Sequence, residues 1–104
     1  GRRFRELLPI LWMKAGAIGR CPQLSNDDVP QMLILPENGF AVLTDEKAFS
    51  AFLESVSMHD DIRMVYLVTD SDSMNCEMSR CFPKRQTCQL YRDYLDNFRI
   101  NVNR

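Results

Sequence analysis

The residues best suited to chemistry are two aspartates, Asp70 and Asp72, which follow an apolar run. The run, Met64 to Val68, is rich in β-forming residues and leads directly into a polar turn. This pattern is typical of a strand buried on both faces of a parallel sheet. Ligands of open α/β sheets collect at the carboxyl ends of such strands, and two carboxylates there can hold Mg²⁺ with water and a substrate phosphate. One hypothesis is therefore a Mg²⁺-dependent phosphohydrolase or nuclease-like domain that uses Asp70 and Asp72.

The same aspartates also have a structural interpretation, which we favour. Asp70 or Ser71 is a suitable N-cap for a following helix, and Asp72 then lies in the first turn, where a carboxylate is favourable. Haloacid-dehalogenase-like phosphohydrolases begin with a similar strand and Asp-x-Asp. They usually carry Thr or Val two residues after the second aspartate, where this chain has Met74. No later lysine followed by a paired acidic motif is recognisable.

The remaining reactive side chains do not form a recognisable site. The cysteines are Cys21, Cys76, Cys81 and Cys88. They lack the close Cys-x-x-Cys pairs of zinc modules, and the single histidine, His59, is remote in sequence. With no secretory signal in these residues, we expect free thiols in a reducing cytoplasm. Gly16 and Gly19 lack the pattern of a phosphate-binding loop and are expected to end a helix.

A second candidate surface is basic and lies toward the C-terminus. Tyr91, Tyr94 and Phe98 recur at helical spacing close to two arginines. Such a combination can stack on bases and neutralise the phosphates of nucleic acid. The alternative is that the aromatic rings are core residues and that the arginines extend outward to solvent. The candidate cations for contact with DNA or a protein partner are Lys84, Arg85, Arg92 and Arg99.

Composition is ordinary for a globular domain. The 104 residues are 45% hydrophobic and 26% charged. No apolar run approaches the roughly 20 residues of a membrane span, so no membrane partner is expected. The formal net charge is −1, but basic side chains gather in residues 1–25 and 80–104 and acidic ones in residues 26–79. The basic ends either share one face that attracts an anionic partner or neutralise the acidic middle, and we favour the second interpretation.

Hydrophobic spacing predicts a single α/β domain over residues 1–104. We expect helices near residues 4–15, 45–58, 72–80 and 92–100 and strands near residues 32–35, 40–44, 62–69 and 86–91. Pro9 is expected to divide the first helix, and Asn38-Gly39 to supply the positive φ angles of a hairpin turn. Right-handed crossovers after the hairpin give a small mixed, mainly parallel four-stranded sheet with flanking helices. Met64 to Val68 should be its most buried segment.

Four stretches taken together resemble a known family. They are residues 7–17, 40–43, 65–71 and 89–101, and the last, Gln89-Leu90-Tyr91-Arg92-Asp93-Tyr94-Leu95-Asp96-Asn97-Phe98-Arg99-Ile100-Asn101, is the most specific. In this order they resemble the C-terminal region of bacterial adenine-specific DNA methyltransferases, including modification subunits similar to those of type III restriction systems. The resemblance implies a parent enzyme that transfers a methyl group from S-adenosylmethionine to adenine N6 in DNA.

For these residues the resemblance implies an accessory role. No position matches the family's Asp/Asn-Pro-Pro-Tyr tetrad or its cofactor loop, so no catalytic residue carries over and no cofactor is expected within residues 1–104. We expect a fragment of a longer protein, with the catalytic methyltransferase domain outside it. Its expected role is that of a non-catalytic C-terminal domain that serves DNA engagement, dimerisation or docking of a restriction subunit.

Overall fold

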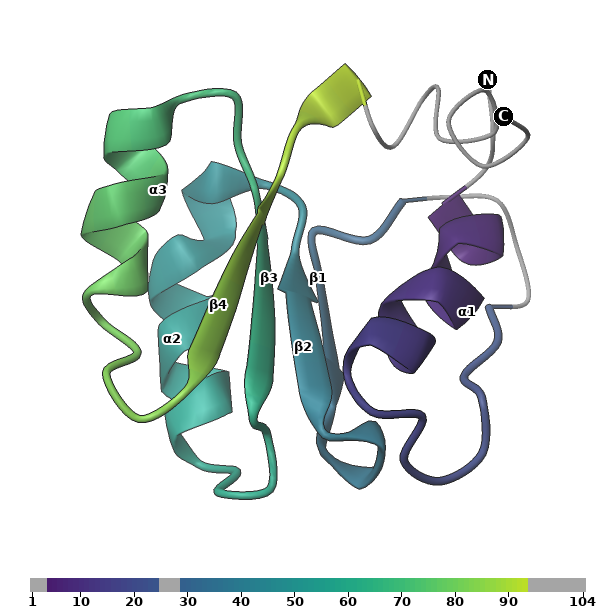
Figure 1. The fold of residues 1–104 in the computed structure, drawn as a ribbon. Coiled ribbons are helices and arrows are strands. Elements are labelled where there is room, and N and C mark those ends of the chain that lie inside the picture. The colour runs from purple at the N-terminus through teal and green to yellow at the C-terminus, as the bar shows by residue number, and fades with distance from the viewer. Residues whose placement is uncertain (1–3, 25–28, 94–104) are drawn as a thin grey trace.

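A computed structural model describes residues 4–24 and 29–93, which form a four-stranded sheet between two layers of helices (Figure 1). The elements are α1 (Phe4–Lys14), β1 (Met32–Leu35), η1 (Pro36–Asn38), β2 (Phe40–Leu43), η2 (Glu46–Ala48), α2 (Phe49–Ser57), β3 (Met64–Val68), α3 (Asp72–Ser79) and β4 (Gln86–Leu90), where η marks a 3-10 helix. The predicted α/β architecture is confirmed, and each strand falls within its expected range. The helix expected near residues 92–100 lies almost entirely outside the described residues. None of the described helices is long and apolar enough to cross a membrane.

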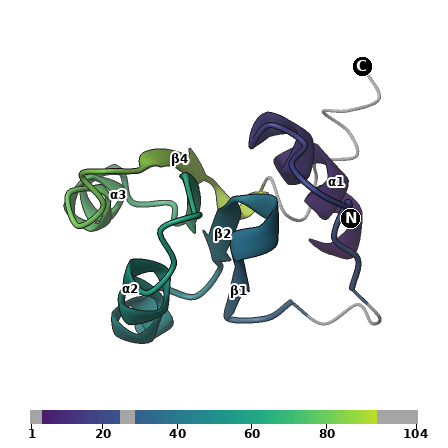
Figure 2. The same cartoon turned by 90° about the horizontal axis from the view of Figure 1, so that it is seen from below.

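The strands lie side by side in the sheet in the same order as in the sequence. The strand order is β1-β2-β3-β4, with β1 and β2 antiparallel and the other neighbours parallel. Both crossover helices, α2 and α3, cover one face of the sheet, and α1 covers the other (Figure 2). Ligand crevices of open α/β sheets form where the strand order reverses. The described strands have no such reversal, so the general reason for expecting a ligand beside Asp70 and Asp72 does not apply to them.

The strand β3 lies at the centre of two hydrophobic clusters, as predicted. All five of its residues are buried. Met64, Tyr66 and Val68 belong to the cluster under α1. Val65 and Leu67 belong to the cluster under α2 and α3. Successive side chains of a strand point to opposite faces, so an unbroken apolar run is what a strand covered on both sides requires.

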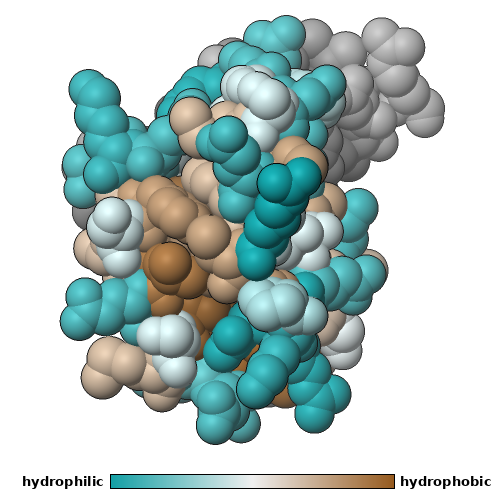
Figure 3. Space-filling view, turned by 90° about the vertical axis from the view of Figure 1, so that its left-hand side faces the viewer, coloured by the Kyte–Doolittle hydropathy of each residue, from teal (hydrophilic) through white to brown (hydrophobic). Residues whose placement is uncertain are grey.

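The side of the molecule that carries α3 is less evenly covered. Figure 3 shows apolar side chains in a recessed area on this side, with hydrophilic side chains around it. Partly buried residues packed against the cluster under α2 and α3 include Phe49 and Leu53 of α2. The two crossover helices therefore cover most, but not all, of the apolar surface on their face of the sheet.

The helix α1 continues through Pro9, so the expected division at that residue is wrong. Leu7, Leu8 and Leu11 are fully buried. Pro9 is exposed, on the side of the helix away from the sheet. A proline inside a helix costs about 3 kcal/mol, whereas each fully buried leucine contributes about 1.5–3 kcal/mol. The Tyr66 hydroxyl also donates a 2.7 Å hydrogen bond to the Leu11 carbonyl oxygen, which ties the helix to β3.

The hairpin between β1 and β2 turns through η1. Gly39 has the predicted positive φ, at 77°, but Asn38 does not and belongs to η1 instead. The register pairs Leu35 with Phe40, so the connection is longer than the tight Asn-Gly turn expected from the sequence. Asn38 is buried, which leaves its side chain for the contacts described below.

Side chains cap two of the described helices, and the cap at Ser71 was predicted. The Asp45 carboxylate accepts the backbone N–H of Lys47 at 3.0 Å and opens η2. The Ser71 hydroxyl accepts the backbone N–H of Met74 at 3.1 Å and opens α3. Of the two alternatives for α3, Ser71 rather than Asp70 is therefore the cap. Asp72 lies in the first turn of α3, as expected.

Candidate functional site

The two candidate carboxylates lie at the carboxyl edge of the sheet. Asp70 and Asp72 follow β3, and Tyr91 and Arg92 follow β4, its parallel neighbour. The ends of these strands meet at the top of Figure 1. The structure therefore brings together three residues that the sequence singled out for different roles, Asp70, Asp72 and Arg92. We call the following set the carboxyl-edge cluster: Asp70, Asp72, Gln89, Tyr91 and Arg92.

Both carboxylates accept hydrogen bonds from the end of β4 and the residues after it. Oδ1 of Asp72 accepts the Tyr91 hydroxyl at 2.9 Å and Nε2 of Gln89 at 3.1 Å. Oδ1 of Asp70 accepts the backbone N–H of Arg92 at 2.9 Å. The carboxylates thus join the loop after β3 to the chain that leaves β4. Their first effect is structural, as the favoured interpretation predicted, although Asp70 acts on a segment other than α3.

Arg92 ties this cluster to a third strand end. Its Nη2 donates to the carbonyl oxygen of Thr44, directly after β2, at 2.5 Å. A guanidinium has five N–H donors, and one of them makes this contact. The Arg92 side chain as a whole is exposed. Arg92 can therefore hold the strand ends together and still offer donors to a partner.

Three of the four predicted cations lie in the described part of the chain, and they lie at the two ends of β4. Lys84 and Arg85 precede β4, and Arg92 follows it, so the length of the strand separates them. At about 3.3 Å per residue, a strand of that length keeps the two groups at opposite edges of the sheet. Arg99 lies outside the described residues. Contact of Lys84, Arg85 and Arg92 with DNA or a protein partner stays a prediction, with the three cations divided between the two ends of β4.

Arg85 is directed inward at the amino edge of the sheet. Its Nη2 donates to the carbonyl oxygens of Val56 at 3.0 Å and His59 at 3.1 Å. Its Nε donates to the carbonyl oxygen of Ile62 at 2.9 Å. These carbonyls belong to the last turn of α2 and to the loop after it, where a cation is favourable. Arg85 is half-buried and serves as a tie between α2, β3 and β4.

The remaining candidate ligands stay apart. All four cysteines are free. Within residues 4–24 and 29–93, no three His, Cys, Asp or Glu side chains are placed to hold a metal ion together. Mg²⁺ keeps several of its waters and needs few protein ligands, so its binding by Asp70 and Asp72 stays a prediction. The hydrogen bonds from Tyr91 and Arg92 would compete with the ion for the carboxylate oxygens.

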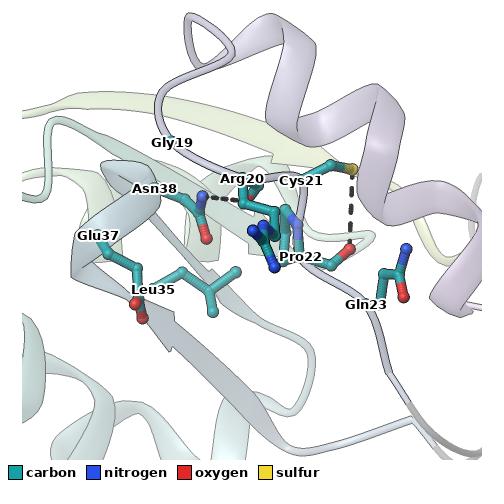
Figure 4. Close-up of a pocket in the computed structure, with 8 residues that line it drawn as sticks. All are labelled: Gly19, Arg20, Cys21, Pro22, Gln23, Leu35, Glu37 and Asn38. Atoms are coloured by element: carbon teal, nitrogen blue, oxygen red, sulfur yellow. Dashed lines mark hydrogen bonds between the residues drawn. The ribbon is translucent and has the colours of Figure 1, made fainter.

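A second feature, which no sequence motif indicates, is a cleft beside the hairpin turn (Figure 4). Its volume is about 540 Å³, and its lining residues are Gly19, Arg20, Cys21, Pro22, Gln23, Leu35, Glu37 and Asn38. Asn38 shapes the cleft, because its Nδ2 donates to the carbonyl oxygens of Ile18 at 2.8 Å and Arg20 at 2.7 Å. The sequence signal was Asn38-Gly39, which indicated only a turn.

The hydrogen bond between Tyr91 and Asp72 has a measurable consequence. The pKa of Tyr91 is raised above its usual 10.0, first because its hydroxyl donates to Asp72 and then because of the charge of Asp72, partial removal from water and the charge of Asp70. The stability gained from the protonated phenol is therefore fully present below the unfolded-state pKa. It is lost as the pH rises through the higher folded-state pKa.

We expect Asp72→Asn to lower the pKa of Tyr91 toward its usual value, because the negative charge beside the phenol is removed. A carbon NMR titration of the tyrosine rings measures this pKa directly. Asp61→Asn, at the opposite edge of the sheet, is the control and should leave the Tyr91 titration unchanged. Identical Tyr91 titrations in the parent protein and in Asp72→Asn would contradict the contact.

No family model matches this chain, and neither a curated protein nor a solved structure is significantly similar to it. The likeness of residues 89–101 to DNA methyltransferases therefore stays a prediction from the sequence. The fold and the cluster define a small α/β domain whose carboxyl-edge side chains hold the chain that leaves β4.

Proposed function

We propose that this chain is a non-catalytic C-terminal domain of a bacterial DNA adenine-N6 methyltransferase of a restriction-modification system. In this role it holds the segment at residues 89–101 in position for contact with DNA. The observation that carries the proposal is the carboxyl-edge cluster. The stretch with the most specific resemblance begins inside that cluster, and its first residues are hydrogen-bonded to Asp70, Asp72 and Thr44.

The cluster sets the direction in which the chain leaves the sheet. Arg92 and Asp93 are helical, and the backbone N–H of Arg92 donates to the Asp70 carboxylate. The first N–H groups of a helix lack partners within it, and a carboxylate is a favourable acceptor for them. Asp70 supplies this acceptor from the neighbouring strand. Asp72 restrains Gln89 and Tyr91 in addition, so the segment starts from a fixed position.

Arg92 is the described cation best placed to touch an anion beside this segment. It is exposed, and its remaining guanidinium donors match the geometry of a phosphate group. Asp70 and Asp72 lie next to it, so the contact expected here is local rather than a broad basic surface. The logarithm of the DNA affinity falls linearly with the logarithm of the salt concentration, and the loss of one phosphate contact makes this slope less steep by about 1.

We expect the chain to bind duplex DNA in a salt-sensitive manner and Arg92→Gln to weaken this binding about equally for all sequences. Fluorescence anisotropy of labelled duplexes at several salt concentrations measures the affinity and the slope, and the slope should fall by about 1 in Arg92→Gln. Arg63→Gln, an exposed cation directly before β3 that is not among the predicted contacts, is the control. Circular dichroism of both variants checks that the loss of affinity does not come from unfolding.

Two results would count against the proposal in different ways. An absence of salt-sensitive binding to duplex DNA would remove the DNA contact and favour docking of a restriction subunit or a second copy, which light scattering detects. A parent coding sequence that lacks both the cofactor loop and the catalytic tetrad would overturn the family assignment itself.

A further inference from the structure

The cleft beside the hairpin turn contains a side-chain acceptor whose orientation the fold fixes. Asn38 is 3% exposed. Its Nδ2 donates to two backbone carbonyls, which fixes the orientation of the amide and leaves Oδ1 as the atom that faces the cleft. Figure 4 shows Oδ1 directed into the space between the two sides of the cleft. Within residues 4–24 and 29–93 no hydrogen bond to this oxygen is observed, and it is not one of the buried polar atoms that lack a partner, so it is open to a ligand in the cleft.

The two sides of the cleft are held close together at Gly19. Its φ is +69°, and a Cβ there would lie 3.0 Å from the carbonyl oxygen of Glu37 and 3.3 Å from Nδ2 of Asn38. A side chain at this position would therefore push residues 19–23 away from the hairpin. Because the sides are fixed in this way, the cleft is formed before any ligand arrives, which is typical of small-molecule sites.

Opposite charges line the cleft on either side of the Asn38 oxygen. Figure 4 shows the Arg20 guanidinium beside Asn38 and the Glu37 carboxylate on the side of Asn38 away from Arg20. The two charges cancel, so the cleft does not favour a polyanion. It favours a ligand that carries both charges. Leu35 and Pro22 add apolar surface to the lining.

We propose that this cleft binds a free α-amino acid. The carboxylate of the ligand pairs with the Arg20 guanidinium, whose fork geometry suits a carboxylate. Its ammonium group donates to Oδ1 of Asn38 and to the Glu37 carboxylate, and three N–H donors are enough for both acceptors. The ligand side chain lies along Leu35 and Pro22. The volume of about 540 Å³ leaves room for a large apolar side chain.

This site is separate from the carboxyl-edge cluster and does not depend on the proposed function. The cleft lies where β1 ends and β2 begins, whereas the cluster lies where β3 and β4 end. Its lining residues make none of the hydrogen bonds of the cluster described above. A failure of one proposal therefore leaves the other standing.

The test is an NMR titration of the isotope-labelled chain with single amino acids. Phenylalanine and leucine are expected to shift the amide signals of residues 19–23 and 35–39, and glycine is expected to bind more weakly. N-acetylphenylalanine lacks the ammonium group, and phenylalanine amide lacks the carboxylate. Each should bind at least about tenfold more weakly than phenylalanine, because each leaves one charged group of the cleft without its partner.

Two exposed residues provide the variants, because their replacement leaves the fold intact. Arg20→Gln and Glu37→Gln should each lower the affinity for phenylalanine about tenfold or more. Arg63→Gln, an exposed cation before β3, is the matched control and should retain the affinity of the parent protein. Asn38 is left unchanged, because its amide also holds Ile18 and Arg20.

Three outcomes would overturn the proposal. One is the absence of shifts at these residues with any amino acid at about 10 mM, which corresponds to negligible affinity. A second is equal binding of phenylalanine and the two analogues. The third is that inorganic phosphate shifts the same signals as strongly as phenylalanine does, since Arg20 would then be a simple anion site.

Discussion

Replacement of Phe82 by alanine is expected to lower the free energy of unfolding by about 3–5 kcal/mol. The ring is 2% exposed. Its centroid lies 6.1 Å from that of Phe49 and 5.9 Å from that of Phe52, and both contacts are edge-to-face. Phe49 and Phe52 belong to α2, whereas Phe82 follows α3. The ring therefore joins the two crossover helices, and its loss leaves a cavity that a close-packed core refills only in part.

Urea denaturation followed by circular dichroism measures this loss. Met58→Ala is the control, since Met58 is 75% exposed at the end of α2 and its removal should change the free energy of unfolding by less than about 0.5 kcal/mol. A loss below about 1 kcal/mol for Phe82→Ala would show that the ring does not pack between the helices. Replacement of a buried phenylalanine by alanine lowers the free energy of unfolding by several times that amount.

Phe82 also shows how far the sequence alone predicts this fold. The strand β3 was predicted correctly because its signal is local: consecutive apolar residues must be buried on both faces of a sheet. Phe82 stands beside Pro83 in a segment whose local pattern indicates only the end of a helix. Its burial depends on contacts with α2, about thirty residues away in sequence, and no local periodicity encodes such contacts.

The same distinction applies to the candidate sites. Asp70 was expected to cap a helix, and it does accept a helical N–H, but that N–H belongs to Arg92 after the next strand. The local sequence placed Asp70 beside the start of α3, but the residue that caps α3 is Ser71. Asn38 was interpreted through its neighbour Gly39 as part of a turn. Its role in shaping a cleft depends on carbonyl oxygens about twenty residues earlier in the chain. Partners of this kind are set by the topology of the whole domain.

Arg85→Met is expected to lower the free energy of unfolding by about 2–3 kcal/mol, because hydrogen bonds from a charged group contribute about 1.5–3 kcal/mol and are not additive. Methionine keeps most of the aliphatic length and removes the three donors to Val56, His59 and Ile62. The carbonyls of Val56 and His59 also accept backbone N–H groups, which limits the loss. The Ile62 carbonyl loses the contact with Nε, and this should be the larger part of the effect.

A comparison of Arg85 with its neighbour Lys84 tests whether the loop before β4 stabilises the fold or binds DNA. Lys84 is exposed, so Lys84→Met should change the free energy of unfolding by less than about 0.5 kcal/mol. If the loop before β4 instead serves DNA, the two variants should lose DNA affinity alike and keep the stability of the parent protein. Urea denaturation and DNA titration of both variants separate these outcomes. If Arg85 is structural, Arg85→Met alone should lose stability. DNA binding should then stay unchanged wherever the protein is folded, because three donors of this half-buried guanidinium are held by backbone carbonyls.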